Sequence, residues 1–166
     1  MFRIGEHVIH PGQGVCTVTG YDEGGAAPML VLESKQGHAR TRMLYPVAQS
    51  DRLHATVSRE EAERLIAGYL DMECDSFTER NSSLEETHFK QLLKRGMPDT
   101  MRVAKTMRHR IREAERLSKK PSSYYARVLK EAHRRSVEEL AVALECSEDD
   151  IEARFEQMMQ VQPSDN

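Results

Sequence analysis

The sequence is poor in several features that define common protein classes. Its 166 residues include no tryptophan, three cysteines and only 5% aromatic residues. No purely aliphatic run exceeds five residues, far short of the roughly 20 apolar residues that a membrane-spanning helix needs. The first seven residues include an acid and a glycine where a secretory signal needs a continuous apolar segment. These absences argue against a membrane protein and predict a protein that stays in the cytoplasm.

Residues that typically carry catalysis or metal binding are also scarce or badly spaced. Cys16, Cys74 and Cys146 are odd in number and far apart, so neither a CxxC metal knuckle nor a closed disulfide framework is available. Reduced, mostly buried thiols are expected instead. No serine or cysteine lies in a nucleophile-elbow pattern. The sequence therefore predicts no catalytic residue, no metal and no cofactor, and an enzyme is the least supported class.

Residues 1–56 have the pattern of short β-strands. β-Prone runs at 8–9, 15–18 and 29–32 are separated by glycine and proline clusters, and residues 40–47 provide a further strand. The glycines at 12 and 14 lie between two of these strands and lack the lysine of a phosphate loop, which favours a hairpin turn. Short strands joined by tight turns predict a small barrel.

From residue 57 onward the pattern changes to amphipathic helices. Ser58 and Glu61 match a capping box before a helical apolar pattern. A polar, acid-rich connector at 73–81 leads to a second helix, which Ser82 or Ser83 is expected to cap. Gly96 and the proline that follows it mark the end of that helix and the start of the next.

Three further helices complete the expected architecture, at about 98–117, at about 122–144 and from Ser147 onward. The predicted fold class is therefore α+β, with a small N-terminal β-barrel at 1–56 and a C-terminal all-α bundle of about five helices at 57–166. The wheel of the fourth helix predicts a core face of Tyr125, Leu129, Ala132, Ser136, Leu140, Ala143 and Leu144.

The net charge of −3 hides a strong segregation of charge along the chain. Residues 90–135 hold fifteen basic and four acidic side chains, a net charge of +11. Residues 57–89 and 136–166 carry −6 and −8, and residues 1–56 are neutral. The average excludes a protein that coats nucleic acid by bulk charge, but the middle of the helical half is strongly cationic.

A helical wheel at about 100° per residue divides the third helix into an apolar face and a basic face. The apolar face contains Met101, Ala104, Met107 and Ile111. The basic face and the cations near the helix ends form a set of Arg102, Lys105, His109, Arg112, Arg116, Lys90, Lys94, Arg95, Lys119 and Lys120, here called the basic set. Such a set can follow a phosphate backbone. A solvated helix face, or one neutralised by the flanking acidic helices, is the open alternative.

The opening residues carry a more specific signal. They read Phe2, Ile4-Gly5-Glu6, Val8-Ile9 and His10-Pro11-Gly12-Gln13-Gly14-Val15. This order resembles the start of the CarD/CdnL family, which has a Phe, a Gly-Asp, an apolar pair, a Tyr- or His-Pro and a His-Gly. Glu6 and Gln13 are the two mild departures. Further similarities follow in order at residues 29–32, 46–47, 92–96 and 117–120. The resemblance covers almost the whole chain.

The resemblance implies a bacterial transcription regulator without enzymatic activity. In this family a Tudor-like barrel, shared with transcription-repair coupling factor, binds the β subunit of RNA polymerase by adding its sheet edge to a strand of that subunit. Main-chain hydrogen bonds supply the affinity of such pairing, and side chains set the register. By position, the residues expected to bind RNA polymerase are Arg40, Arg42, Met43, Leu44 and Tyr45.

The helical domain of this family contacts promoter DNA at the upstream edge of the melted bubble, where a tryptophan wedges into the minor groove. An apolar wedge holds an unstacked base step open. This chain has no tryptophan, and counting back from the turn at 92–96 brings Phe77 close to the position of the family's tryptophan, so Phe77 is the expected substitute. The residues predicted to bind DNA are Phe77, Lys90, Lys94, Arg95, Arg102, Lys105, His109, Arg112 and Arg116.

The leading hypothesis is a CarD-like regulator that binds the polymerase β subunit through its barrel and promoter DNA through its basic helices. The main alternative is a polymerase-binding adaptor that lacks the promoter wedge and recruits another protein.

Overall fold

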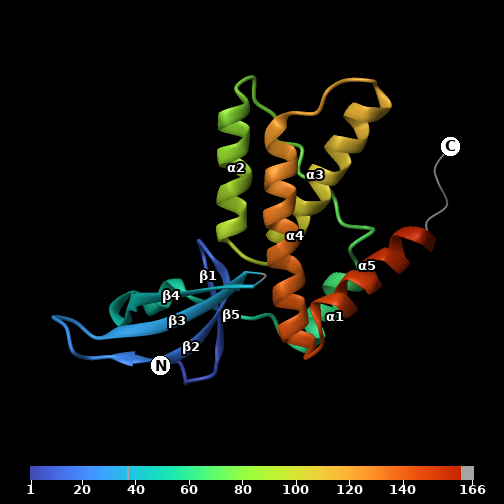
Figure 1. The fold of residues 1–166 in the computed structure, drawn as a ribbon. Helices are drawn as coiled ribbons and strands as arrows, with labels where there is room; N and C mark the ends of the chain where they lie inside the picture. The colour runs from blue at the N-terminus through green and yellow to red at the C-terminus, as the bar shows by residue number, and fades with distance from the viewer. Residues whose placement is uncertain (37, 162–166) are drawn as a thin grey trace. The chain divides into compact units, whose positions relative to one another are not determined.

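The structure, a computed structural model, describes residues 1–36 and 38–161. The chain divides into two compact units, Met1–Thr56 and Val57–Asn166. The first contains all the described strands and the second contains the five described α-helices (Figure 1). The predicted α+β fold class is confirmed.

A five-stranded antiparallel sheet forms the first unit. Its strands follow the order β4-β3-β2-β1-β5, so β4 and β5 are the edge strands. The expected hairpin turn joins β1 to β2, where the Gln13 amide donates to the His10 carbonyl at 3.1 Å. The strands are β1 (His7–His10), β2 (Gly14–Asp22), β3 (Met29–Gln36), β4 (Ala39–Pro46) and β5 (His54–Ala55), with a short 3-10 helix at Val47–Arg52.

One face of this sheet is apolar because side chains alternate between the two faces of each strand. Its buried cluster consists of Val8, Cys16, Val18, Leu30, Leu32 and Leu53. Partly buried Met43 and Tyr45 pack against this cluster from β4. β4 is therefore fixed to the unit by its inward side chains as well as by its pairing with β3.

The first two helices begin after residues whose side chains accept hydrogen bonds from first-turn amides. The Ser58 hydroxyl accepts a hydrogen bond from the Glu61 amide at 3.1 Å, which confirms the predicted cap. The second helix differs from its prediction, because Asn81 is the cap and accepts from the Ser83 amide at 2.9 Å. No helix in the described part of the chain is long and apolar enough to span a bilayer. The helices are α1 (Arg59–Ala67), α2 (Ser82–Lys94), α3 (Asp99–Arg116), α4 (Ser123–Leu144) and α5 (Glu148–Val161).

The long helix α4 packs on two separate apolar clusters. Its first half joins α2 and α3 in one cluster, and its second half joins α1 and α5 in the other. The buried arc of α4 is consequently wider than a single stripe, and the predicted core face is corrected. Tyr124, Val128 and Val137 are buried, whereas Tyr125 and Leu129 are only half-buried.

Candidate functional site

The outer edge of β4 is the first candidate site. β4 pairs with β3 along its whole length, and no other described strand pairs with it. Residues of an antiparallel strand alternate between positions that exchange hydrogen bonds with the partner strand and positions that do not. The Val47 amide donates to the Pro28 carbonyl at 3.1 Å, so Pro46, which has no amide hydrogen, occupies a position not bonded to β3. The same alternation turns the peptide groups of Arg40, Arg42 and Leu44 away from β3.

The side chains of β4 divide between the two faces of the sheet. Met43 and Tyr45 face the apolar cluster, whereas Arg42 and Leu44 are exposed, and 51% of Leu44 is accessible. Arg40 lies 3.8 Å from Glu33 on the neighbouring strand, and both side chains are well exposed. The predicted segment therefore presents free peptide groups, two arginines and one leucine along a single edge.

The second candidate site is the basic set, and several of its members are already paired with carboxylates of the same unit. The pairs are Lys90 with Glu86 at 3.1 Å, Arg95 and Arg102 with Asp99 at 3.9 and 3.1 Å, and Arg116 with Glu113. All four cationic side chains are at least 38% exposed, so water screens these pairs and each is weak. Neighbouring acids therefore neutralise part of the basic set, which is the alternative left open by the sequence.

Lys105 differs from the rest of the basic set because its ammonium group is used inside the fold. It donates to the backbone carbonyls of Tyr69, Leu70 and Met72 at 2.9, 2.6 and 2.5 Å. These carbonyls lie in the turn that follows α1, where backbone acceptors lack helical partners. The structure thus places Lys105 as a cap of this turn and away from the exposed basic face.

The basic set contains fewer exposed residues without an acidic partner than the net charge of +11 for residues 90–135 implies. Within residues 1–36 and 38–161, Lys94, Arg112, Lys119 and Lys120 make no ion pair. His109 is also exposed on α3. These residues are the part of the basic set that an anionic partner can reach without displacing a carboxylate.

Phe77 lies in the connector before α2 and is half-buried. Its ring stacks on His88 of α2, with ring centroids 3.9 Å apart and planes 16° from parallel. His88 Nε2 lies 3.0 Å from Asp75 Oδ2, and the Phe77 amide donates to Asp75 Oδ1 at 2.7 Å. Burial raises the pKa of Asp75, but these hydrogen bonds outweigh it and leave the pKa below its usual value. The connector is therefore held in place at Phe77.

A buried polar network also fixes the connector that precedes α2. Arg110 of α3 is 3.0 Å from Glu85 and also donates to the carbonyls of Asp75 and Phe77. The Tyr124 hydroxyl donates to Glu85, and burial together with this hydrogen bond raises the pKa of Tyr124 above its ordinary value. Sequence reasoning missed this network. The available signal was that Arg110 follows the buried positions 103, 106 and 107 at helical spacing, so it faces the core.

The comparison with known families bears on the first unit. A family model described as the CarD-like/TRCF RID domain matches residues 2–57. These residues belong to that family. The resemblance of the opening motif to CarD/CdnL proteins is thereby confirmed for the RID domain. No curated protein matches the chain.

The RID match includes β4 and bears on the function of its outer edge. An RID domain is an RNA polymerase-interacting domain, so the chain is an RNA polymerase-interacting, transcription-related protein. The RID match ends at residue 57, one residue into the helical unit. The match therefore gives no information on the function of the basic set or of Phe77.

Proposed function

We propose that this chain is a CarD-like transcription regulator that binds the RNA polymerase β subunit through β4 and promoter DNA through its helical unit. The observation that carries the proposal is an RID domain whose edge strand turns the peptide groups of Arg40, Arg42 and Leu44 outward. A strand of the β subunit that pairs with this edge would exchange hydrogen bonds with rigid, preformed donors and acceptors.

Side chains on β4 are suited to fix the register of this pairing. Arg42 and Leu44 lie two residues apart on the exposed face, so an added strand would meet a charge and an apolar contact at successive positions. Met43 and Tyr45 support the edge from the core side. In this proposal Arg40, Arg42 and Leu44 meet the added strand. Met43 and Tyr45 anchor β4 to the core.

For DNA, the proposal assigns phosphate contacts to the exposed basic residues and omits Lys105. Binding by the helical unit alone is expected to be weak, since several members of the basic set already have acidic partners. Attachment to polymerase raises the local concentration of the helical unit at the promoter and compensates for this weakness. The residues proposed to touch phosphates are Lys90, Lys94, Arg95, Arg102, His109, Arg112 and Arg116.

Phe77 is proposed to act as the wedge at the upstream edge of the bubble. Its present stack on His88 resembles in kind the stack that it would form with a nucleobase. A ring pair contributes about 0.5–1.5 kcal/mol and base–aromatic stacking about 1–3 kcal/mol, so exchange of one for the other is energetically feasible. His88 thus keeps Phe77 ordered until a base step replaces it.

Phe77 and the basic set also have properties that support the adaptor function. Phe77 already has an aromatic partner, and several cations already have acidic partners. An adaptor would bind polymerase without measurable affinity for DNA, and would use the helical unit to recruit another protein.

Two measurements on the full chain test the proposal. A pull-down must retain the isolated β subunit, and failure to do so removes the polymerase-binding function. Titration of fork-junction DNA at several salt concentrations must show binding that weakens steeply with salt, because phosphate contacts release counterions. A flat salt response, or no DNA binding in the presence of polymerase, favours the adaptor.

A further inference from the structure

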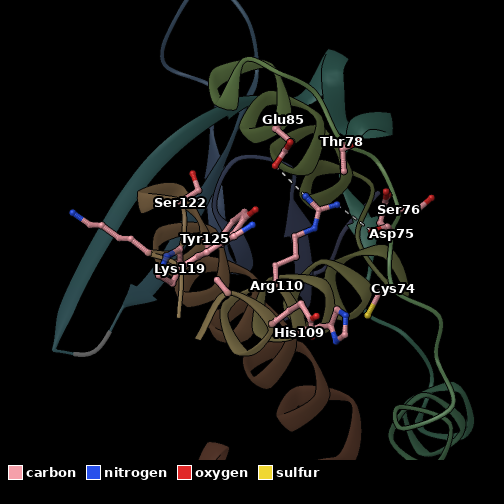
Figure 2. A pocket seen from close by; sticks show the side chains of 14 residues that line it. Cys74, Asp75, Ser76, Thr78, Glu85, His109, Arg110, Lys119, Ser122 and Tyr125 are labelled. Carbon is pink, nitrogen blue, oxygen red and sulfur yellow. Dashed lines mark hydrogen bonds and ion pairs between the residues drawn. The ribbon is translucent and has the colours of Figure 1, made fainter. Parts of the chain in front are cut away.

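A cavity of about 600 Å³ lies within the helical unit, beside the connector that carries Phe77. Figure 2 shows Lys119, Ser122 and Tyr125 along one side of it, Asp75 on the opposite side and Arg110 between them. The volume falls in the range of about 300–1,000 Å³ that is typical of small-ligand sites. The cavity is therefore large enough for a ligand of that class.

The charge that this cavity offers to a ligand is positive. Three acids line it, and each has a partner: Glu85 pairs with Arg110, Glu113 pairs with Arg116, and Asp75 Oδ2 lies 3.0 Å from His88 Nε2. Lys119 and Lys120, which also line it, are exposed and make no ion pair with any described residue. Two uncompensated ammonium groups at its rim favour an anionic ligand.

The uncharged lining favours a ligand with a flat ring. Tyr125 is half-buried in the cavity wall and is held edge-on by Tyr124, with ring centroids 4.8 Å apart. Ala114 and Pro121 add apolar surface. Within the described part of the chain, the hydroxyl groups of Tyr125 and Ser122 make no hydrogen bond and are available to a ligand. An anion joined to a flat, hydrogen-bonding ring is the chemistry of a nucleotide.

The position of the cavity connects it to the proposed wedge. Ser76 and Thr78 line the cavity, whereas Phe77 between them stacks on His88. A base step opened by Phe77 would leave an unpaired nucleotide one residue along the connector from the lining of the cavity. Enzymes that flip a base out of the duplex receive it in a pocket.

We propose that this cavity binds one unpaired nucleotide of the promoter strand, with the phosphate at Lys119 and Lys120 and the base against Tyr125. The inference rests on the proposed DNA-binding function and extends it to a second site. The same chemistry would fit a free mononucleotide, but the position beside Phe77 favours a nucleotide within a DNA strand.

The test uses the full chain and fork-junction DNA with 2-aminopurine as the first unpaired base. Binding is expected to change the fluorescence of this base and to be tighter for the fork than for a paired duplex of equal length. Tyr125→Ala and the double variant Lys119→Glu/Lys120→Glu should lower the fork-to-duplex affinity ratio about 5-fold or more, as expected for the loss of one base stack or phosphate contact. The lysine variant changes only exposed side chains, so it keeps the test valid if Tyr125→Ala fails to fold.

A control is Lys130→Glu, which reverses one lysine charge at an exposed site on α4 outside the cavity. It should leave the fork-to-duplex ratio unchanged. Equal losses for fork and duplex in the lysine variant would overturn the cavity site while leaving DNA binding intact. Binding of free deoxyadenosine monophosphate without an effect on the fork would overturn the strand assignment. Absence of binding to both DNAs would overturn the proposed DNA-binding function, and this inference with it.

Discussion

Proline substitution at the β4 edge is the sharpest test of polymerase binding by strand addition. The double variant Arg42→Pro/Leu44→Pro removes two amide hydrogens that point away from β3. The ladder between β3 and β4 keeps its hydrogen bonds, because edge strands tolerate proline where the amide faces outward. The variant should still fold, and it should lose affinity for the β subunit.

The expected loss of affinity follows from the number of hydrogen bonds removed. Each backbone hydrogen bond contributes about 0.5–1.5 kcal/mol net, so two contribute about 1–3 kcal/mol. This corresponds to a Kd for the β subunit that is about 5- to 150-fold weaker. The proline rings would also collide with the added strand, so the predicted range is a minimum.

The assay is biolayer interferometry of the full chain on the immobilised β subunit, with thermal unfolding as the check on folding. The matched control, Arg42→Ala/Leu44→Ala, removes the same side chains but keeps both amides. Met43→Pro, one position away, removes a bond to β3 and should lower Tm instead. If the folded double-proline variant binds as tightly as the double-alanine variant, main-chain pairing at β4 is refuted.

Three further predictions concern the helical unit. Arg112→Glu should weaken fork-DNA binding and reduce the slope of log K against log salt by about 1, whereas Lys130→Glu should not, as measured by fluorescence anisotropy. Phe77→Ala should shorten the lifetime of the open complex about 5-fold or more in a competitor-challenge assay; an unchanged lifetime would favour the adaptor. Because the pKa of Asp75 is lowered in the fold, its contribution to stability is present at neutral pH and is lost as the pH falls through that lowered value. Asp75→Asn should therefore reduce the free energy of unfolding in urea at pH 7 more than at pH 3, and equal reductions would contradict this role.

Local rules were enough to predict most of the fold. Capping boxes, glycine turns and the change of apolar period at residue 57 depend on neighbours within a few positions of the chain. For the same reason Ser58 was predicted correctly as a cap, and the strand at 40–47 was placed close to β4. The RID domain was also recognisable, because its turn and strand residues lie together in one short segment.

Interactions between distant segments were not predictable in this way. Lys105 had the spacing of an exposed stripe, yet carbonyls more than thirty positions earlier bind its ammonium group. The pair of Glu85 and Arg110 spans 25 positions and becomes visible only when α2 and α3 pack. Asn81 competed with two adjacent serines for the cap, and local propensity does not separate these residue types.

The shared carboxylate beside Arg95 and Arg102 has a consequence for the protein's distribution in the cell. A chromosome offers on the order of 10⁶ or more non-specific sites, and each competes with a promoter for any basic protein. A phosphate that approaches this pair competes with Asp99, so its gain is reduced by the small energy of the two exposed ion pairs. Under the proposed DNA-binding function, random encounters with duplex DNA would gain less from these two arginines, and more of the protein would stay free to meet polymerase.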